Sequence, residues 1–131
     1  MLLSKHEAWQ KRDDEQRINL DMNQWKFDFT RRWFVNRNMT TWSTFMPRRF
    51  PADQPIKMIQ IGVFEGMDLV WMFQNILKHP HSHVLAIDPW EATTKLDAEY
   101  MEGCRKRAHH NLHLWRRQIT FAPTYSGVAL P

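Results

Sequence analysis

The chain has 131 residues, with 18 Lys and Arg against 14 Asp and Glu, and a single Cys. That length suits one domain, and no stretch approaches the roughly 20 apolar residues of a membrane span. One Cys forms neither an internal disulfide nor a multi-Cys zinc site, and the first residues lack the apolar core of a signal peptide. We therefore expect a cytoplasmic protein without a metal site.

The chain divides near residue 54 into two parts. Residues 1–54 are charged and aromatic, and the stretch from Ser4 to Asn38 contains neither Pro nor Gly. Trp25, Phe29 and Trp33 recur every four residues, which predicts one or two helices with an apolar stripe. Residues 39–50 are β-branched, aromatic and irregular, and the prolines that follow predict an extended connection.

Residues 55–131 alternate short apolar runs with helical patterns. The runs predict strands at Ile56–Ile61, His83–Asp88 and Gln118–Ala122, and the helical spacing predicts helices at Gly66–Lys78 and Thr93–Trp115. Thr93 or Thr94 is the expected N-cap of the second helix. This order of elements is typical of a parallel sheet with right-handed crossovers. We expect an α/β fold: a minimal, half Rossmann-like βαβαβ sheet preceded by N-terminal helices.

The segment from Ile59 to Gly66 carries the chemistry. It leaves the first strand at Gly62 and opens a helix at Gly66, and Asp88 ends the second strand 22 residues later. Gly62 permits a tight turn, Gly66 lets the backbone approach a ligand, and an acid at that strand end can accept hydrogen bonds from ribose hydroxyls. The pattern predicts a nucleotide-binding unit. The alternative is an ordinary strand–helix turn with a surface acid.

The turn differs from the common phosphate-binding loops. No Gly-Lys-Ser/Thr follows it, and Phe64 and Glu65 stand where a dinucleotide-binding loop has its middle glycine. A bulky turn that carries a carboxylate would repel a pyrophosphate. It suits a cationic nucleoside without phosphate.

At these residues the sequence resembles the class I S-adenosylmethionine (SAM)-dependent methyltransferases, in the branch with an E-I-G-x-x-x-G-x-S first motif and an I-D-x-W second motif. The resemblance covers residues 56–126 and, more loosely, residues 33–47. It implies a SAM-dependent methyltransferase in which residues 62–66 wrap the methionine part of SAM and Asp88 holds the ribose. Pro89 and Trp90 would flank the adenine, with Thr124 or Ser126 beside it. The implied cofactor-binding residues are Gln60, Gly62, Phe64, Glu65, Gly66, Asp68, Asp88, Pro89, Trp90 and Ser126.

Three departures from that family bear on activity. Gln60 stands where the family has an acid, and Asp68 stands where it has Ser. Glu65 and Asp68 lie nearest the predicted sulfonium and are the candidates for a catalytic role, while Tyr125 is a candidate on the acceptor side; the sequence assigns no general base. The third departure is an absence. The family's fourth motif, an acidic segment that faces the transferred methyl, should follow Ser126, but the sequence ends at Pro131. We therefore expect either a fragment of a longer enzyme or a homo-oligomer, most simply a dimer, that covers the edge of the strand at residues 56–61. The N-terminal helix is the alternative cover.

Arginines interleaved with aromatic residues suit phosphate contact combined with base stacking. RNA, for example ribosomal RNA, is the expected acceptor, and a small molecule is the alternative. A solvated basic face is the structural alternative. Two other functions stay open: a SAM-binding module without catalysis, and a basic RNA-binding protein that reuses half a nucleotide fold. The candidate RNA contacts are Arg31, Arg32, Arg37, Arg48, Arg49, Arg105, Arg107, Arg116 and Arg117.

Overall fold

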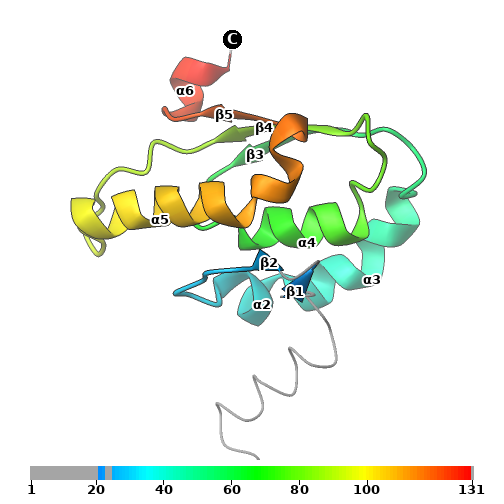
Figure 1. Cartoon of the computed structure of the whole chain (residues 1–131), viewed down its shortest axis with the longest axis horizontal. Coiled ribbons are helices and arrows are strands. Elements are labelled where there is room, and N and C mark those ends of the chain that lie inside the picture. The colour runs from blue at the N-terminus through cyan, green and yellow to red at the C-terminus, as the bar shows by residue number, and fades with distance from the viewer. Residues whose placement is uncertain (1–20, 23–24, 131) are drawn as a thin grey trace, which may run out of the picture.

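The computed structural model of the chain describes residues 21–22 and 25–130. Its helices and strands stack as a sheet, a layer formed by two long helices, and a third layer formed by the N-terminal elements (Figure 1). In chain order the elements are β1 (Asp21–Met22), β2 (Trp25–Lys26), α2 (Trp33–Arg37), α3 (Met39–Arg49), β3 (Lys57–Ile61), α4 (Met67–Asn75), β4 (His83–Ile87), α5 (Ala98–Asn111), the 3-10 helix η1 (His113–Gln118), β5 (Ile119–Ala122) and α6 (Ser126–Ala129).

The sheet has three parallel strands in the order β3-β4-β5. Lys57 lies opposite His83, and Val84 lies opposite Ile119. The crossover helices α4 and α5 lie on the same side of this sheet (Figure 1). The predicted alternation of strands and helices and the parallel sheet are therefore confirmed. The arrangement is compatible with a minimal Rossmann-like unit.

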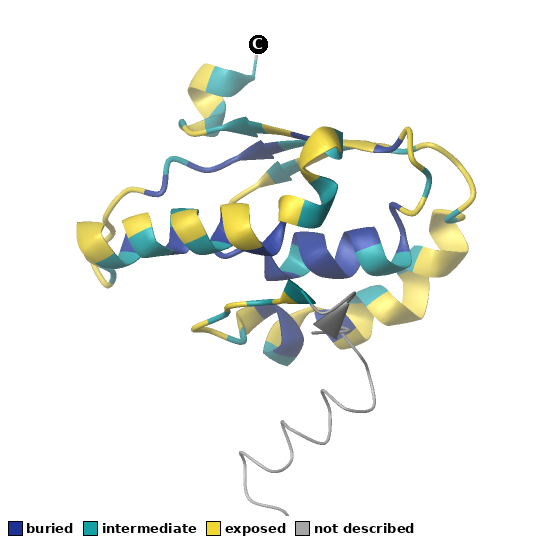
Figure 2. Ribbon diagram, viewed as in Figure 1, coloured by how far each residue is buried: buried dark blue, intermediate teal, exposed yellow. Residues whose placement is uncertain are grey.

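Helix α4 forms the centre of the molecule. It is buried on nearly all sides, because the sheet covers one side and α2 and α3 cover the other (Figure 2). A helix between two layers needs apolar residues around its whole circumference, and its sequence supplies them. Trp71 is 1% exposed, and its ring packs against Phe34 and Trp42 with centroids 5.9 Å away in both cases. The core therefore lies between α4 and its neighbours on both sides.

The predicted helix is wrong for residues 25–32. Trp25 begins the two-residue strand β2, the chain then runs without regular structure, and only α2 is helical. The four-residue spacing of the aromatics therefore does not form one stripe. Trp25 stacks on His110 and His113, while Trp33 stacks on Phe64. The parts of the predicted helix at residues 4–20 and 23–24 lie outside the described residues.

Two further predictions of secondary structure need correction. Residues 39–49, predicted to be irregular, form α3, in which the Ser43 hydroxyl donates to the Met39 carbonyl at 2.7 Å. Pro47 has no N–H to bond to the carbonyl of Ser43, and the helix ends two residues later at Arg49. Helix α5 begins at Ala98 and not near Thr93, because the side chain of Asp97 caps it by accepting from the Tyr100 N–H at 2.7 Å.

The face of the sheet opposite α4 and α5 carries exposed apolar side chains. Ile59 is 55% exposed and Ile61 is 60% exposed. Within the described residues β3 pairs only with β4, and residues 25–37 lie beneath the helices, away from the sheet (Figure 1). The alternative cover for this strand edge is therefore not found in the described part of the chain. None of the helices in that part combines the length and apolar character that crossing a bilayer requires.

Candidate functional site

The loop between β3 and α4 is built from left-handed backbone. Gly62, Phe64 and Gly66 have φ angles of 80°, 54° and 83°. A Cβ on Gly66 would lie 3.0 Å from the Leu112 side chain, whereas a Cβ on Gly62 would meet nothing within 4 Å. Gly66 is therefore required by its conformation and by close packing, and Gly62 by its conformation alone. Phe64 adopts this conformation without being glycine, so other contacts must hold it.

Asp88 supplies those contacts from the end of β4. Its Oδ2 accepts from the backbone N–H groups of Val63 and Phe64, both at 2.8 Å, and its Oδ1 accepts from the N–H of Trp90 at 2.8 Å. The indole N–H of Trp90 donates to the Phe64 carbonyl at 2.7 Å. A carboxylate has about four acceptor positions, so three bonds leave about one for a ligand. Asp88 is 8% exposed.

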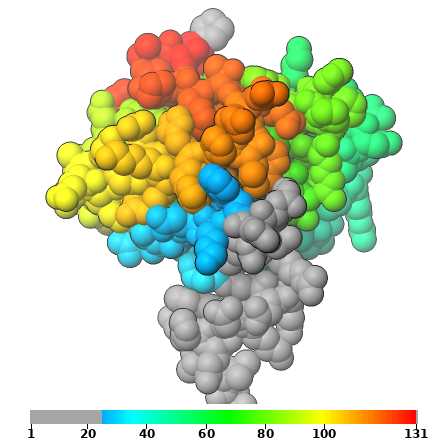
Figure 3. All heavy atoms as spheres, viewed as in Figure 1, coloured from blue at the N-terminus to red at the C-terminus, as the bar shows by residue number. Residues whose placement is uncertain are grey.

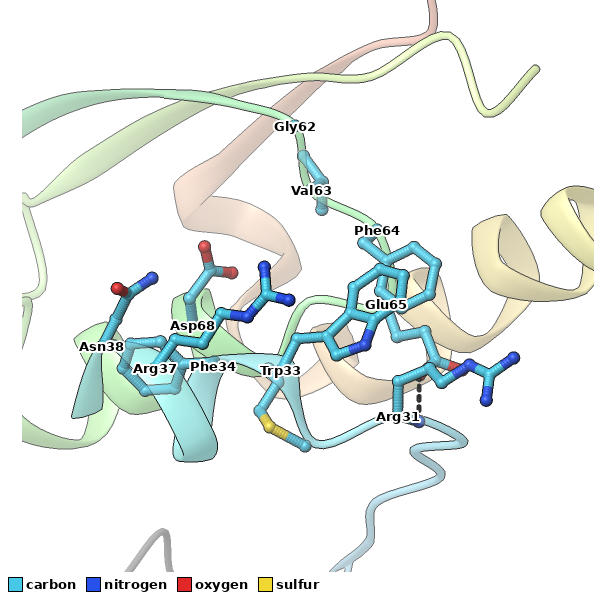
Figure 4. Close-up of a pocket in the computed structure, with 11 residues that line it drawn as sticks. Arg31, Trp33, Phe34, Arg37, Asn38, Gly62, Val63, Phe64, Glu65 and Asp68 are labelled. Atoms are coloured by element: carbon cyan, nitrogen blue, oxygen red, sulfur yellow. Dashed lines mark hydrogen bonds between the residues drawn. The ribbon is translucent and has the colours of Figure 1, made fainter. Parts of the chain in front are cut away.

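A pocket of about 200 Å³ opens between this loop and helix α2 (Figure 4). Its position matches the rule for open α/β sheets, in which ligands bind beyond the carboxyl ends of the strands. One wall comes from residues 62–68 and the other from the N-terminal segment that leads into α2. The lining residues are Arg31, Trp33, Phe34, Arg37, Asn38, Gly62, Val63, Phe64, Glu65, Met67 and Asp68.

Asp68 places a carboxyl group inside this pocket. Its Oδ2 accepts from the side-chain amide of Gln60 at 2.7 Å, and its Oδ1 accepts from the Leu69 N–H at 2.9 Å. Burial raises the pKa of Asp68 to about 6, although these hydrogen bonds act in the opposite direction. The pocket therefore holds a carboxyl group that changes charge close to neutral pH.

A guanidinium and an aromatic ring complete the pocket. Arg37 and Asp68 both direct their charged groups into it (Figure 4). No hydrogen bond or ion pair joins the Arg37 guanidinium to any other residue that the structure describes. Trp33 is 43% exposed and stacks on Phe64 with ring centroids 4.7 Å apart. A free cation, an acid and an aromatic wall suit a ligand that carries both a carboxylate and an ammonium group.

Glu65, a candidate for the sulfonium neighbourhood, has its carboxylate committed elsewhere. It is 1% exposed, and its oxygens accept from the N–H groups of Thr30 and Arg31 at 2.9 and 3.1 Å. They also accept from the Thr30 hydroxyl at 2.8 Å. This carboxylate fixes the segment before α2 and has little capacity left for a ligand.

The structure gathers part of the predicted cofactor site. Gly62, Phe64, Glu65 and Asp68 line one pocket, Gln60 reaches it through Asp68, and Asp88 binds the loop. The other six predicted residues lie outside the pocket lining: Gln60, Asp88, Gly66, which is the N-cap of α4, Pro89, which is half-buried, Trp90, which is 5% exposed, and Ser126, which begins α6.

The predicted RNA contacts come from several elements, and two of them, Arg31 and Arg107, both lie over the ring of Tyr100, 5.6 and 5.8 Å from its centroid. Arg31 and Arg37 line the pocket, Arg32 lies between them in sequence, and Arg48 and Arg49 end α3. On α5, Arg105 pairs with Glu102 at 2.6 Å, and Arg107 lies 3.6 Å from Glu65. Arg116 and Arg117 belong to η1. The basic residues therefore divide among several elements.

Among the residues that sequence reasoning did not assign to this site are Trp33 and Asn38, which line the pocket, and Asn111, which lies beside it. Asn111 is fully buried, and its amide donates to the carbonyls of Asp28 and Glu65, both at 2.9 Å. One signal could have found it, because it occupies the apolar face of α5 that Met101, Cys104 and Ala108 form. A polar residue on such a face needs buried partners.

Comparison of the chain with protein-family models, with curated proteins and with solved structures gives no significant match. Within residues 21–22 and 25–130, no three His, Cys, Asp or Glu side chains gather as they would around a metal ion. Function is therefore argued from the geometry of the pocket and from the sequence pattern that leads into it.

Proposed function

We propose that the protein binds SAM at the carboxyl edge of its sheet and transfers the methyl group to an acceptor. The observation that carries this proposal is the pocket between the left-handed loop at residues 62–66 and the Arg37 guanidinium, with Asp68 inside it. The resemblance to SAM-dependent methyltransferases concerns the same loop. A SAM-binding module without catalysis is the alternative, and it shares the binding site but not the transfer.

The pocket suits the amino-acid end of SAM. Its volume of about 200 Å³ accommodates an amino acid but not a complete nucleoside with it. In this arrangement Arg37 binds the α-carboxylate, because a guanidinium pairs with a carboxylate through two parallel hydrogen bonds. Asp68 binds the α-ammonium when it is ionised. The net positive charge of SAM then requires this acid, since Arg37 alone would repel it.

The nucleoside would extend from the pocket toward β4. Asp88 has about one acceptor position left after its three backbone bonds, which is enough for one ribose hydroxyl. Because Asp88 also fixes the loop, its replacement would disturb the pocket and the ribose contact together. A substitution at Arg37 is the cleaner test, since Arg37 is exposed and its side chain bonds to no described residue.

The first experiment is isothermal titration of the protein with SAM. We expect Arg37→Ala to weaken binding about tenfold to a hundredfold, because a hydrogen bond to a charged group contributes about 1.5–3 kcal/mol. Arg48→Ala is the matched control, since Arg48 is exposed on α3 and does not line the pocket. Absence of SAM binding at millimolar ligand would overturn the proposal.

We propose RNA as the acceptor, with a small molecule as the alternative. The supporting observation is local: Arg31, which is not needed for the amino-acid end of SAM, lines the pocket together with the exposed ring of Trp33. Guanidinium groups next to an aromatic face suit a phosphate and an unstacked base. Transfer of a tritiated methyl group from SAM to RNA or to a small-molecule extract distinguishes the two acceptors. Binding of SAM without transfer to either would favour the module without catalysis.

We further propose that the protein self-associates along β3, as the sequence predicts. The support is the unpaired side of β3 within the described residues, together with the exposed side chains of Ile59 and Ile61. Parallel sheets are normally covered on both faces, and an open apolar edge invites pairing.

A further inference from the structure

We infer that Glu65 is a positioning residue, which fixes the N-terminal segment so that Arg37 can reach the carboxylate of the ligand. The inference rests on the proposed function. It concerns residues 25–31, called the strap below. The strap lies against α5 and η1 (Figure 3) and leads directly into α2, which supplies Trp33 and Arg37 to the pocket.

Three side-chain contacts fix the strap along its length. At its start, the indole of Trp25 stacks on His110 and on His113 at centroid distances of 4.7 and 5.2 Å, and its N–H donates to the His110 carbonyl. In the middle, Asn111 accepts from the Asp28 N–H at 2.7 Å and donates to the Asp28 carbonyl at 2.9 Å. At its end, the Glu65 carboxylate accepts hydrogen bonds from the N–H groups of Thr30 and Arg31.

The last contact joins the strap to the ligand loop itself. Glu65 directly precedes Gly66, the N-cap of α4, so its backbone belongs to the glycine loop while its carboxylate binds the strap. The Thr30 hydroxyl has one proton and gives it to Glu65, so Tyr100 must donate its own proton to Thr30. Asn111 also donates to the Glu65 carbonyl, which ties the middle of the strap to the same residue.

A carboxylate buried at this position is costly unless it is paired, and an apolar residue would fill the space without that cost. What Glu65 adds is a fixed distance between the two walls of the pocket. The stacking of Trp33 on Phe64 is the second contact between those walls, and Arg37 follows one helical turn after Trp33. Loss of the Glu65 contact should therefore displace Arg37 relative to the loop, while the loop keeps its own bonds to Asp88.

This role makes a prediction about ligand chemistry. A ligand with an amino-acid end needs Arg37 and therefore Glu65, whereas a nucleoside without that end needs neither. S-adenosylhomocysteine and 5′-methylthioadenosine are the matched probes, because they share the nucleoside and a neutral sulfur and differ at the amino-acid end. A residue with only a structural role would affect both probes alike.

The test compares both probes by isothermal titration on Glu65→Gln. The glutamine keeps the size of the side chain but replaces one acceptor oxygen with an NH₂ donor that faces the donors of the strap. We expect about a tenfold loss of S-adenosylhomocysteine affinity and a change below about twofold for 5′-methylthioadenosine. Glu102→Gln, an exposed position on α5, is the control and should change neither. If Glu65→Gln does not fold, Thr30→Val removes one strap donor and serves the same comparison.

A double-mutant cycle gives an independent readout on S-adenosylhomocysteine alone. If Glu65 acts through Arg37, adding Glu65→Gln to Arg37→Ala weakens binding little further, whereas additive losses overturn the inference. Equal loss of both probes, or loss of neither, also overturns it and leaves the proposed function intact. A wild-type protein that binds neither SAM nor S-adenosylhomocysteine overturns both proposals.

Discussion

Two acids that the sequence places in one short segment have different roles in the structure. Glu65 and Asp68 both follow the glycine turn, and the sequence predicts both near a sulfonium. The carboxylate of Glu65 is occupied by the backbone of residues 30 and 31, while Asp68 bonds to Gln60 and to the start of α4 within the pocket. Only Asp68 therefore keeps acceptor positions available to a ligand.

The raised pKa of Asp68 predicts a pH dependence of stability. The folded state holds this proton up to about pH 6, whereas an unfolded Asp releases it near pH 4. Between these values the folded state binds more protons, so the contribution of Asp68 to stability falls as pH rises, by at most about 3 kcal/mol. Urea unfolding of the wild type should show this decline, and Asp68→Asn should remove it. Asp53→Asn, in an exposed loop, is the control and should leave this decline unchanged.

Ligand binding should depend on pH in the opposite direction. SAM affinity should increase as pH rises through about 6, because ionised Asp68 attracts the ammonium group and protonated Asp68 does not. Titrations with SAM between pH 5 and 7.5 measure this, and Asp68→Asn should bind weakly with a flat profile. An affinity that is independent of pH in the wild type would show that Asp68 does not contact the charged ligand.

At the scale of elements, the sequence correctly predicts those whose conformation is determined by their own residues. The strands β3, β4 and β5 are short apolar runs, and buried parallel strands have that composition in general. The glycines at 62 and 66 mark the loop because their backbone conformation demands them. Both signals lie within the element that they describe, so a single sequence is sufficient to find them.

The strap could not be predicted in this way. Its conformation depends on residues distant in sequence: Trp25 donates to a carbonyl 85 residues away, and Thr30 donates to a carboxylate 35 residues away. The four-residue spacing of Trp25, Phe29 and Trp33 is a helical signal, but these contacts outweigh it. For the same reason the sequence predicts only one wall of the pocket, because the other wall is the continuation of the strap.

For the whole molecule, the question is how the open edge of the sheet at β3 is paired. The helices α4 and α5 lie on one face, and on the other face Ile59 and Ile61 remain more than half exposed (Figures 1 and 2). A two-fold axis perpendicular to the sheet would pair β3 with β3 of a second copy in antiparallel fashion. If this pairing is centred on Ile59, the two copies of that residue lie directly opposite each other.

Sedimentation velocity tests this arrangement at the centre of the proposed pairing. The wild type should sediment as a dimer, and Ile59→Lys should sediment as a monomer, because it places two like charges opposite each other across the strand pair. The variant should still fold, since the side chain of Ile59 is 55% exposed. Phe45→Lys is the control, because Phe45 is 47% exposed on α3, at the other side of the molecule. A wild type that stays monomeric at high concentration, or a control that dissociates equally, would rule out β3 as the interface.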